Sequence, residues 1–422
     1  MTTVSPELPR AGHPWRAVIA ASIGNALEWF DFVVYGFFAT TMARLFFPTA
    51  DQTMSLLLAL GTFGVTFFMR PLGGMVIGSY ADRHGRKAAF SLTIFLMMAG
   101  TAIIVVTPTY ASIGILAPIL LVAARLIQGF SAGAEFGSAT TFLAEQNPQK
   151  RGAFASWQFA SQGITTVLAT GFGIVLFGIL SPEQMDSWGW RIPFAFGLLI
   201  GPVAYYIRRH VDETLEFREL KISEAPLRET LSRNQARLFA SFGIIVLCNA
   251  AMYMVLFMPT YASRQLGLSS TSGFLASLLV GVILVVTTPL FGAWTDRYGR
   301  LPLAFASAIG LLLTIYPMFA WLAQVPTLET LLIVQAIFGL LLSAYLGGLP
   351  ATLAELFPAR MRTTGLSVSY AFSAAIFGGF APFISAWLIE ITGSKLAPSF
   401  YVIFAAIVSL VALVGVRRLG IR

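Results

Sequence analysis

Five ionisable side chains lie within otherwise apolar stretches, where they could bind an anion and carry protons. They are Glu28, Asp31, Arg70, Arg125 and Glu135. A charge inside a membrane-crossing helix costs about 2.5–3.5 kcal/mol on insertion scales, so such residues usually line a polar cavity. A guanidinium presents a planar fork to a carboxylate, and a buried carboxyl beside a like charge titrates nearer to neutrality. These residue types indicate an anion site that is coupled to proton movement.

The composition indicates that these residues belong to a membrane protein. Of the 422 residues, 57% are hydrophobic and 11% are charged, whereas a soluble domain carries about 25% charged residues. This balance excludes ordinary soluble enzymes, secreted disulfide scaffolds and disordered regulators. A helix that crosses a bilayer needs about 20 mostly apolar residues. Breaks in the apolar pattern divide the chain into twelve such segments: residues 16–40, 54–79, 88–107, 111–140, 152–180, 190–208, 237–262, 271–295, 302–322, 327–354, 363–390 and 397–416.

The distribution of Lys and Arg predicts the orientation of these segments. If the N-terminus lies inside, the inner loops and tails hold 21 of the 27 Lys and Arg residues and the outer loops hold four. Basic residues are enriched on the cytoplasmic side, so both termini are predicted to be cytoplasmic. The same bias explains the net charge of +8 without a nucleic-acid partner. Residues 209–236 are predicted to be a cytoplasmic linker between an N-terminal bundle, 1–208, and a C-terminal bundle, 237–422.

A charged motif occurs at the same place in each half of the chain. Gly78-Ser-Tyr-Ala-Asp-Arg-His-Gly-Arg86 follows the second segment, and Gly292-Ala-Trp-Thr-Asp-Arg-Tyr-Gly-Arg300 follows the eighth, 214 residues later. Two copies in register predict an all-α membrane protein with twelve transmembrane helices in two pseudo-symmetric six-helix bundles, an arrangement common in transporters. Each Asp could be held by an arginine or by a helix N-terminus in one conformation and released in another; a purely structural turn is the alternative. The predicted gating residues are Asp82, Arg83, Arg86, Asp296, Arg297 and Arg300.

These loops resemble the major facilitator superfamily. Within it, Asn25-Ala-Leu-Glu-Trp-Phe-Asp31, Arg70-Pro-Leu-Gly-Gly74 and Gln128-Gly-Phe-Ser-Ala-Gly-Ala-Glu135 resemble the metabolite–proton symporter family. The segment at 377–393 is most similar to citrate and tricarboxylate carriers. The resemblance implies the major facilitator fold and a proton-coupled importer of a small carboxylate, citrate or a related tri- or dicarboxylate, that works by alternating access. A carrier of a zwitterionic osmolyte such as proline or betaine, or of another organic acid, is the alternative.

Helical periodicity places the two acids of the first segment on one face. Glu28 and Asp31 share an arc of about 120° with Asn25 and Tyr35. We expect Glu28 and Asp31, together with Glu135, to take up the coupling proton. A permanently ionised set of acids that arginine neutralises to hold helices together is the alternative.

Arginines and neutral polar side chains form the predicted substrate site. Arg125 lies near the middle of the fourth segment, where it could bind a substrate carboxylate or instead pair with one of the acids. Arg70 could be a second anion anchor or part of an inner gate. The neutral side chains could hydrogen-bond to the solute or hold helices together. The predicted substrate-binding residues are Arg125, Arg70, Gln128, Gln162, Asn25, Tyr35 and Tyr370.

Other chemistries are not expected from this sequence. The only cysteine, Cys248, lies in an apolar stretch, and His13, His84 and His210 lie in polar ones. We therefore expect no metal, no cofactor and no catalytic residue. The expected partners are the carboxylate, the proton as coupling ion and membrane lipid. We expect a protein that is not an enzyme and that functions as a monomer in the cytoplasmic (inner) membrane of a bacterium.

Overall fold

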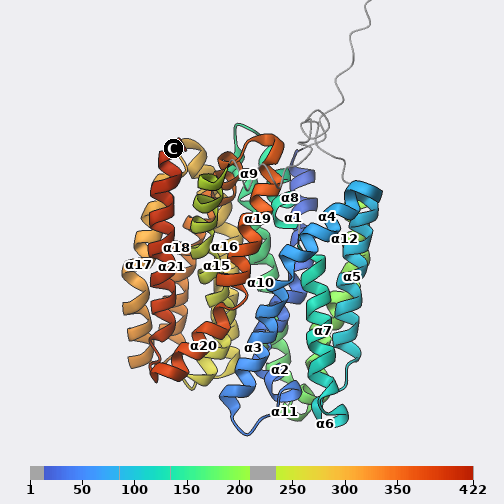
Figure 1. The fold of residues 1–422 in the computed structure, drawn as a ribbon. Helices are drawn as coiled ribbons and strands as arrows, with labels where there is room; N and C mark the ends of the chain where they lie inside the picture. The colour runs from blue at the N-terminus through green and yellow to red at the C-terminus, as the bar shows by residue number, and fades with distance from the viewer. Residues whose placement is uncertain (1–13, 85, 134, 210–233, 422) are drawn as a thin grey trace, which may run out of the picture.

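A computed structural model describes residues 14–84, 86–133, 135–209 and 234–421, which form an all-helical protein (Figure 1). Nine helical segments in this part of the chain are long and apolar enough to cross a membrane. Three further helices, α1 (Pro14–Phe37), α5 (Arg86–Val106) and α12 (Arg191–Arg209), lie at the positions of the other three predicted segments. The prediction of an all-helical membrane protein is therefore confirmed.

The first six segments form an N-terminal bundle and the last six a C-terminal bundle. The N-terminal bundle also contains α2 (Ala39–Phe46), α3 (Gln52–Phe68), α4 (Arg70–His84), α6 (Tyr110–Ile113), α7 (Leu116–Ser131), α8 (Glu135–Glu145), α9 (Arg151–Ala155), α10 (Trp157–Ile179) and α11 (Pro182–Gln184), with a π-helical turn at Met185–Gly189. The C-terminal bundle contains α15 (Gln235–Arg264), α16 (Ser270–Tyr298), α17 (Leu301–Gln324), α18 (Leu328–Leu356), α19 (Arg362–Ser373), α20 (Ala381–Thr392) and α21 (Ala397–Arg418), with a 3₁₀ turn at Ala359–Met361 and a π-helical turn at Ala374–Gly378.

The two bundles lie side by side, one coloured blue to green and the other yellow to red in Figure 1. α1 begins and α21 ends at the same end of the molecule, the upper end of that view, which we call the terminal end. The helix bounds agree with the predicted segments to within about five residues, and the largest shifts are at the end of the second segment, at His84, and at both ends of the fourth, at Leu116 and Glu145. The fourth segment begins at Leu116 instead of 111, because Gly114 adopts a φ of 59° and ends the short α6.

Two breaks place candidate residues in the middle of the N-terminal bundle. The second segment divides at Met69, and α4 begins with Arg70 followed by Pro71. Proline has no N–H to continue the helical hydrogen bonds, which favours a break here. The fourth segment divides after Ser131, and α8 begins at Glu135. Arg70 and Glu135 are therefore each the first residue of a helix that follows a break.

Close helix approach holds the bundles together along their length. α10 packs along α16, where a Cβ on Gly163 would contact the carbonyl oxygen of Gly281. α1 packs against α15, α3 against α20, and α8 against α19.

Polar contacts join the bundles at both ends. At the terminal end, Arg362 Nη1 donates to Glu145 Oε1 over 2.8 Å, with only 8% and 4% of the two side chains exposed. At the opposite end, Arg264 Nη1 donates to Gln52 Oε1 over 2.7 Å.

Replacement of Gly129 by alanine should destabilise the N-terminal bundle. Gly129 of α7 lies against the backbone of Thr66 in α3, and an added Cβ would overlap the Thr66 carbonyl. Overpacking of this kind costs about 1–3 kcal/mol. Thermal unfolding of the purified protein should show a midpoint several degrees below that of the wild type. The matched control is Gly178→Ala in α10, where a Cβ meets open space; equal midpoints for the two variants would contradict the packing.

The buried Glu145–Arg362 pair should contribute to stability far more than an exposed pair. Breaking a buried pair by removing one partner costs about 3–5 kcal/mol. Glu145→Gln and Arg362→Gln should therefore each lower the unfolding midpoint strongly, and the double variant should lose less than the two single losses added together. The control is Asp186→Asn, which removes a pair with Arg44 whose side chains are 31% and 54% exposed, and which should cost about 0–1 kcal/mol. Additive losses at 145 and 362 would refute the coupling.

Candidate functional site

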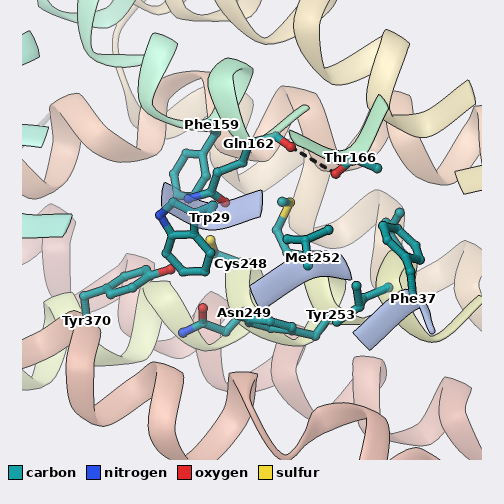
Figure 2. A pocket seen from close by; sticks show the side chains of 13 residues that line it. Trp29, Phe37, Phe159, Gln162, Thr166, Cys248, Asn249, Met252, Tyr253 and Tyr370 are labelled. Carbon is teal, nitrogen blue, oxygen red and sulfur yellow. Dashed lines mark hydrogen bonds between the residues drawn. The ribbon is translucent and has the colours of Figure 1, made fainter. Parts of the chain in front are cut away.

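A central cavity lies between the two bundles. Figure 2 shows Gln162 and Thr166 of α10 on one side of it and Asn249 and Tyr253 of α15 on the other. The hydroxyl of Tyr370 is directed toward Trp29, whose ring stands edge-on to it at a centroid distance of 6.5 Å. The described side chains that line the cavity are uncharged: Trp29, Val33, Phe37, Phe159, Gln162, Thr166, Cys248, Asn249, Met252, Tyr253, Val255, Leu256 and Tyr370.

Arg70 lies directly behind the aromatic wall of this cavity. Its guanidinium carbon is 4.5 Å from the ring centroid of Trp29, and its charge interacts with the side chains of Tyr253 and Tyr370 of the other bundle. The residue is 3% exposed, and its Nε and Nη2 have no hydrogen-bond partner. No carboxylate in the described part of the chain forms an ion pair with it. Aromatic faces attract a cation, but a buried charge is usually paired.

Arg125 is fully buried in the N-terminal bundle and does not line the central cavity. Its Nε donates to Thr66 Oγ1 at 3.1 Å, and its Nη1 donates to Gln128 Oε1 at 2.9 Å and to the Asp31 carbonyl at 3.5 Å. Its Nη2 has no partner. The guanidinium also lies 4.4 Å from the ring centroid of Tyr35.

The two arginines are electrostatically coupled. The positive charges of Arg125 and Arg70 repel each other. Two buried guanidinium groups with unpartnered donors therefore lie on one side of the central cavity.

A second cavity lies within the N-terminal bundle, and its lining includes Glu28, Asp31 and Glu135. The predicted shared face of Glu28 and Asp31 is present, but it points between α5, α7, α8 and α12 instead of into the central cavity. Asp31 Oδ2 accepts a hydrogen bond from Thr101 Oγ1, whereas the buried Oδ1 has no partner.

A chain of hydrogen bonds joins the Arg125 guanidinium to this carboxylate. Arg125 Nη1 donates to Gln128 Oε1, and Gln128 Nε2 donates to Thr101 Oγ1 at 2.9 Å. Thr101 Oγ1 then donates to Asp31 Oδ2. The chain connects side chains of α7, α5 and α1.

The remaining predicted substrate residues fall into two groups. Gln162 and Tyr370 line the central cavity, and Gln162 Nε2 has no partner. Asn25 instead joins α1 to α10, because its Nδ2 donates to Ser161 Oγ at 2.7 Å. Tyr35 donates to a carbonyl of α3 at 3.1 Å, and Gln128 belongs to the chain described above.

The second copy of the repeated motif fastens the bundles at the terminal end. The Asp296 carboxylate accepts the N–H groups of Gly152 and Ala153, at 2.7 and 2.9 Å, at the start of α9. Arg300 donates to Asp296 at 2.7 Å and to Glu355 at 3.0 Å. A helix N-terminus favours a carboxylate. Burial lowers the pKa of Arg300, but Glu355 and Asp296 together raise that pKa above its ordinary value.

The other predicted gating residues do not join this network in the part of the chain that is described. Arg297 is exposed and lies over the ring of Tyr298 at 5.4 Å. The side chains of Asp82, Arg83 and Arg86 lie outside the described residues.

Several residues of the site could not be selected from the sequence. Thr101 is one of many hydroxyl side chains in apolar helices, and the 31–101 contact joins residues far apart in the chain. Gly197 of α12 lies directly against Asp31 Oδ1, with no local signal for this role. Trp29 follows Glu28 directly, and only its position between Arg70 and the cavity distinguishes it from other aromatic residues.

Comparison with known proteins assigns the family. Residues 17–233 match the model described as "Sugar (and other) transporter", and residues 276–420 match the major facilitator superfamily. The citrate–proton symporter of Klebsiella pneumoniae is 38% identical over 400 residues, which cover 94% of this chain and 90% of that protein. A proline/betaine transporter of Salmonella typhimurium is 32% identical over 418 residues, which cover 96% of this chain and 83% of that protein.

The fold is also that of solved transporter structures. The crystal structure of a D-xylose–proton symporter superposes with a TM-score of 0.74 at 16% identity, covering 94% of this chain and 97% of that one. The architecture, the helical segments and the sequence matches agree, and none of them indicates an enzyme. The chain is a multi-pass membrane transporter and belongs to the major facilitator superfamily.

Proposed function

We propose that this protein is a proton-coupled symporter that imports a small carboxylate, citrate or a related tri- or dicarboxylate, into a bacterial cell. The citrate–proton symporters of Klebsiella pneumoniae and Salmonella typhi are 38% and 36% identical to it. In this proposal the protein lies in the inner membrane as a monomer with both termini in the cytoplasm, as its Lys and Arg distribution predicts.

The observation that carries the proposal is the pair of buried, incompletely bonded guanidinium groups of Arg70 and Arg125. Desolvated charges are costly unless they are paired, and arginine pairs best with carboxylates through two parallel hydrogen bonds. Neither guanidinium lines the central cavity in this structure. In this proposal a solute with two or more carboxylates enters through the central cavity and supplies these partners once Trp29 has moved aside. Gln162, Asn249 and Tyr370 offer neutral hydrogen bonds to the rest of the solute.

Proton coupling follows from the acids beside Arg125. When Asp31 is ionised, the chain through Thr101 and Gln128 holds the charge of Arg125 toward it. Protonation removes that competing charge, so that the guanidinium attracts the substrate more strongly. Proton and anion therefore favour each other's binding, and this reciprocity is what symport requires. Glu28 and Glu135 complete the proton-carrying set.

Transport would proceed by rocking of the bundles about the central cavity. The Asp296–Arg300–Glu355 network and the Glu145–Arg362 pair close the terminal end and must open to release substrate. The proposed moving bodies are the bundles within 1–208 and 237–422, and most of the predicted linker, 209–236, lies outside the described residues.

A zwitterionic osmolyte is a second candidate, because the central cavity is uncharged and aromatic. Trp29, Phe159, Tyr253 and Tyr370 line it together. Such rings bind quaternary ammonium groups, and Arg70 could take the single carboxylate of the same molecule. Proline/betaine transporters are among the relatives.

Arg70→Ala should abolish binding of citrate while leaving the protein folded. Loss of one partner of a buried charge pair costs about 2–5 kcal/mol, which is about 30-fold or more in affinity. Isothermal titration with citrate measures the loss, and Arg70→Lys should recover part of the affinity because it restores the charge without the fork. The control is Arg44→Ala, which removes an exposed arginine at the end of the molecule opposite the terminal end. Unchanged citrate affinity in a folded Arg70→Ala protein would remove Arg70 from the site.

A thermal-shift panel should separate the two candidate substrates. Purified protein is heated with citrate, tricarballylate, succinate, betaine or proline at acidic and at neutral pH. Selective stabilisation by the tri- and dicarboxylates, stronger at acidic pH because protonation of Asp31 favours the anion, is the expected result. Stabilisation by betaine or proline alone would replace the first proposal with the second.

A further inference from the structure

Two separate cavities lie on opposite faces of α1. Trp29, Val33 and Phe37 line the central cavity, whereas Glu28 and Asp31 line the cavity inside the N-terminal bundle. No described side chain lines both cavities. The structure therefore keeps the acids away from the space in which the substrate is proposed to bind.

The inner cavity extends from Asp31 toward the terminal end. α1 and α5 both run away from that end, and α12 returns to it (Figure 1). Thr93 lines the cavity and precedes Thr101, the partner of Asp31, by eight residues, which is about 12 Å along a helix. Gly201, which also lines the cavity, follows Gly197 on α12. Thr93 and Gly201 therefore lie nearer to the terminal end than Thr101 and Gly197 do.

Asp31 lines this cavity, and one of its carboxylate oxygens has no hydrogen-bond partner. Its Oδ2 is engaged by Thr101, while Oδ1 is buried, unpartnered and directly against Gly197. The charged and titratable groups around it are Glu28 on α1, Glu135 on α8 and Arg125 on α7. Asp31 is also contacted by Thr101 of α5 and by Gly197 of α12. A Cβ at position 197 would overlap Asp31 Oδ1.

We propose that the cavity lined by Glu28, Asp31 and Glu135 is a proton-exchange chamber, separate from the substrate cavity, through which the coupling proton leaves to the cytoplasm while the central cavity is closed at that end. The proposal rests on the proposed symport function. The step is a simple transfer: the O–H bond of the protonated Asp31 carboxyl group breaks, a water molecule in the chamber accepts the proton as hydronium, and Asp31 is left as the carboxylate. Gly197 is a positioning residue that keeps Oδ1 at the chamber wall.

Thiol labelling tests whether the two compartments are separate. The native Cys248 is the only cysteine and lines the central cavity. In a Cys248→Ser protein, Ala132→Cys places the only thiol at the inner cavity. Everted membrane vesicles, which expose the cytoplasmic face, are treated with the impermeant reagent methanethiosulfonate ethyltrimethylammonium, with and without citrate. Citrate should slow labelling of Cys248 at least about 5-fold and change labelling of the Ala132→Cys protein by less than about 2-fold.

The possible outcomes distinguish this inference from the proposed function. No labelling of the Ala132→Cys protein from the cytoplasmic face, or equal protection of both thiols by citrate, would overturn the separate chamber. Labelling of the Ala132→Cys protein without citrate protection of Cys248 would support the chamber and contradict citrate as the substrate.

Gly197→Ala tests the positioning of Asp31. Proteoliposomes containing the full chain and a trapped pH-sensitive dye report citrate-driven proton movement, and citrate counterflow reports exchange without a proton gradient. Gly197→Ala and Asp31→Asn should each reduce proton-driven citrate accumulation about 10-fold or more. In both variants citrate counterflow should stay within about 3-fold of the wild-type rate. Gly171→Ala, where a Cβ meets open space on α10, should match the wild type in both assays. An equal loss of accumulation and counterflow would mean that Gly197 is merely structural, which would refute its positioning role.

Discussion

The burial of two arginine side chains in a low-dielectric interior is the constraint on which the rest of this structure depends. Arg70 is held by the faces of Trp29, Phe32 and Phe67, with guanidinium–ring distances of 4.2 to 4.9 Å, and lacks a carboxylate partner among the described residues. Arg125 is held by neutral oxygens and by Tyr35. Aromatic faces and neutral acceptors compensate a buried cation only in part. In the proposed function this incomplete compensation leaves the site an attraction for an anion, which a fully formed internal ion pair would remove.

α1 separates the acidic side chains from the aromatic wall of the central cavity. One of its faces contributes Trp29 to the wall of the central cavity, and another contributes Asp31 to the inner cavity. Because both residues lie on one helix, a movement of α1 would change both cavities. The hydrogen bonds through Thr101 and Gln128 provide the physical link between carboxylate and guanidinium. Coupling of this kind requires only that the protonation of Asp31 change how strongly the Arg125 guanidinium attracts an anion.

The fold was largely predictable, and the site was predictable only in part. Apolar length located the helices, and Gly114 accounts for the later start of the fourth segment. The ionisable residues could be chosen because a charge in a membrane-crossing helix is rare and costly. Their partners could not, since Thr101 and Trp29 resemble dozens of other hydroxyl and aromatic side chains. Asn25 shows the converse: its polarity suggested a ligand contact, but it bonds Ser161 and joins two helices.

The sequence by itself determined that this chain crosses a membrane repeatedly, that it consists of two related halves and that its N-terminal half carries the unusual charges. Each of these properties is local, because hydropathy and charge can be read along a helix or compared between repeats. Only the tertiary structure decided which face of each helix meets another, and hence that the acids and the aromatic wall belong to different cavities. Helix rotation depends on packing against neighbours distant in the chain, such as Gly197 against Asp31, and periodicity alone does not specify that neighbour.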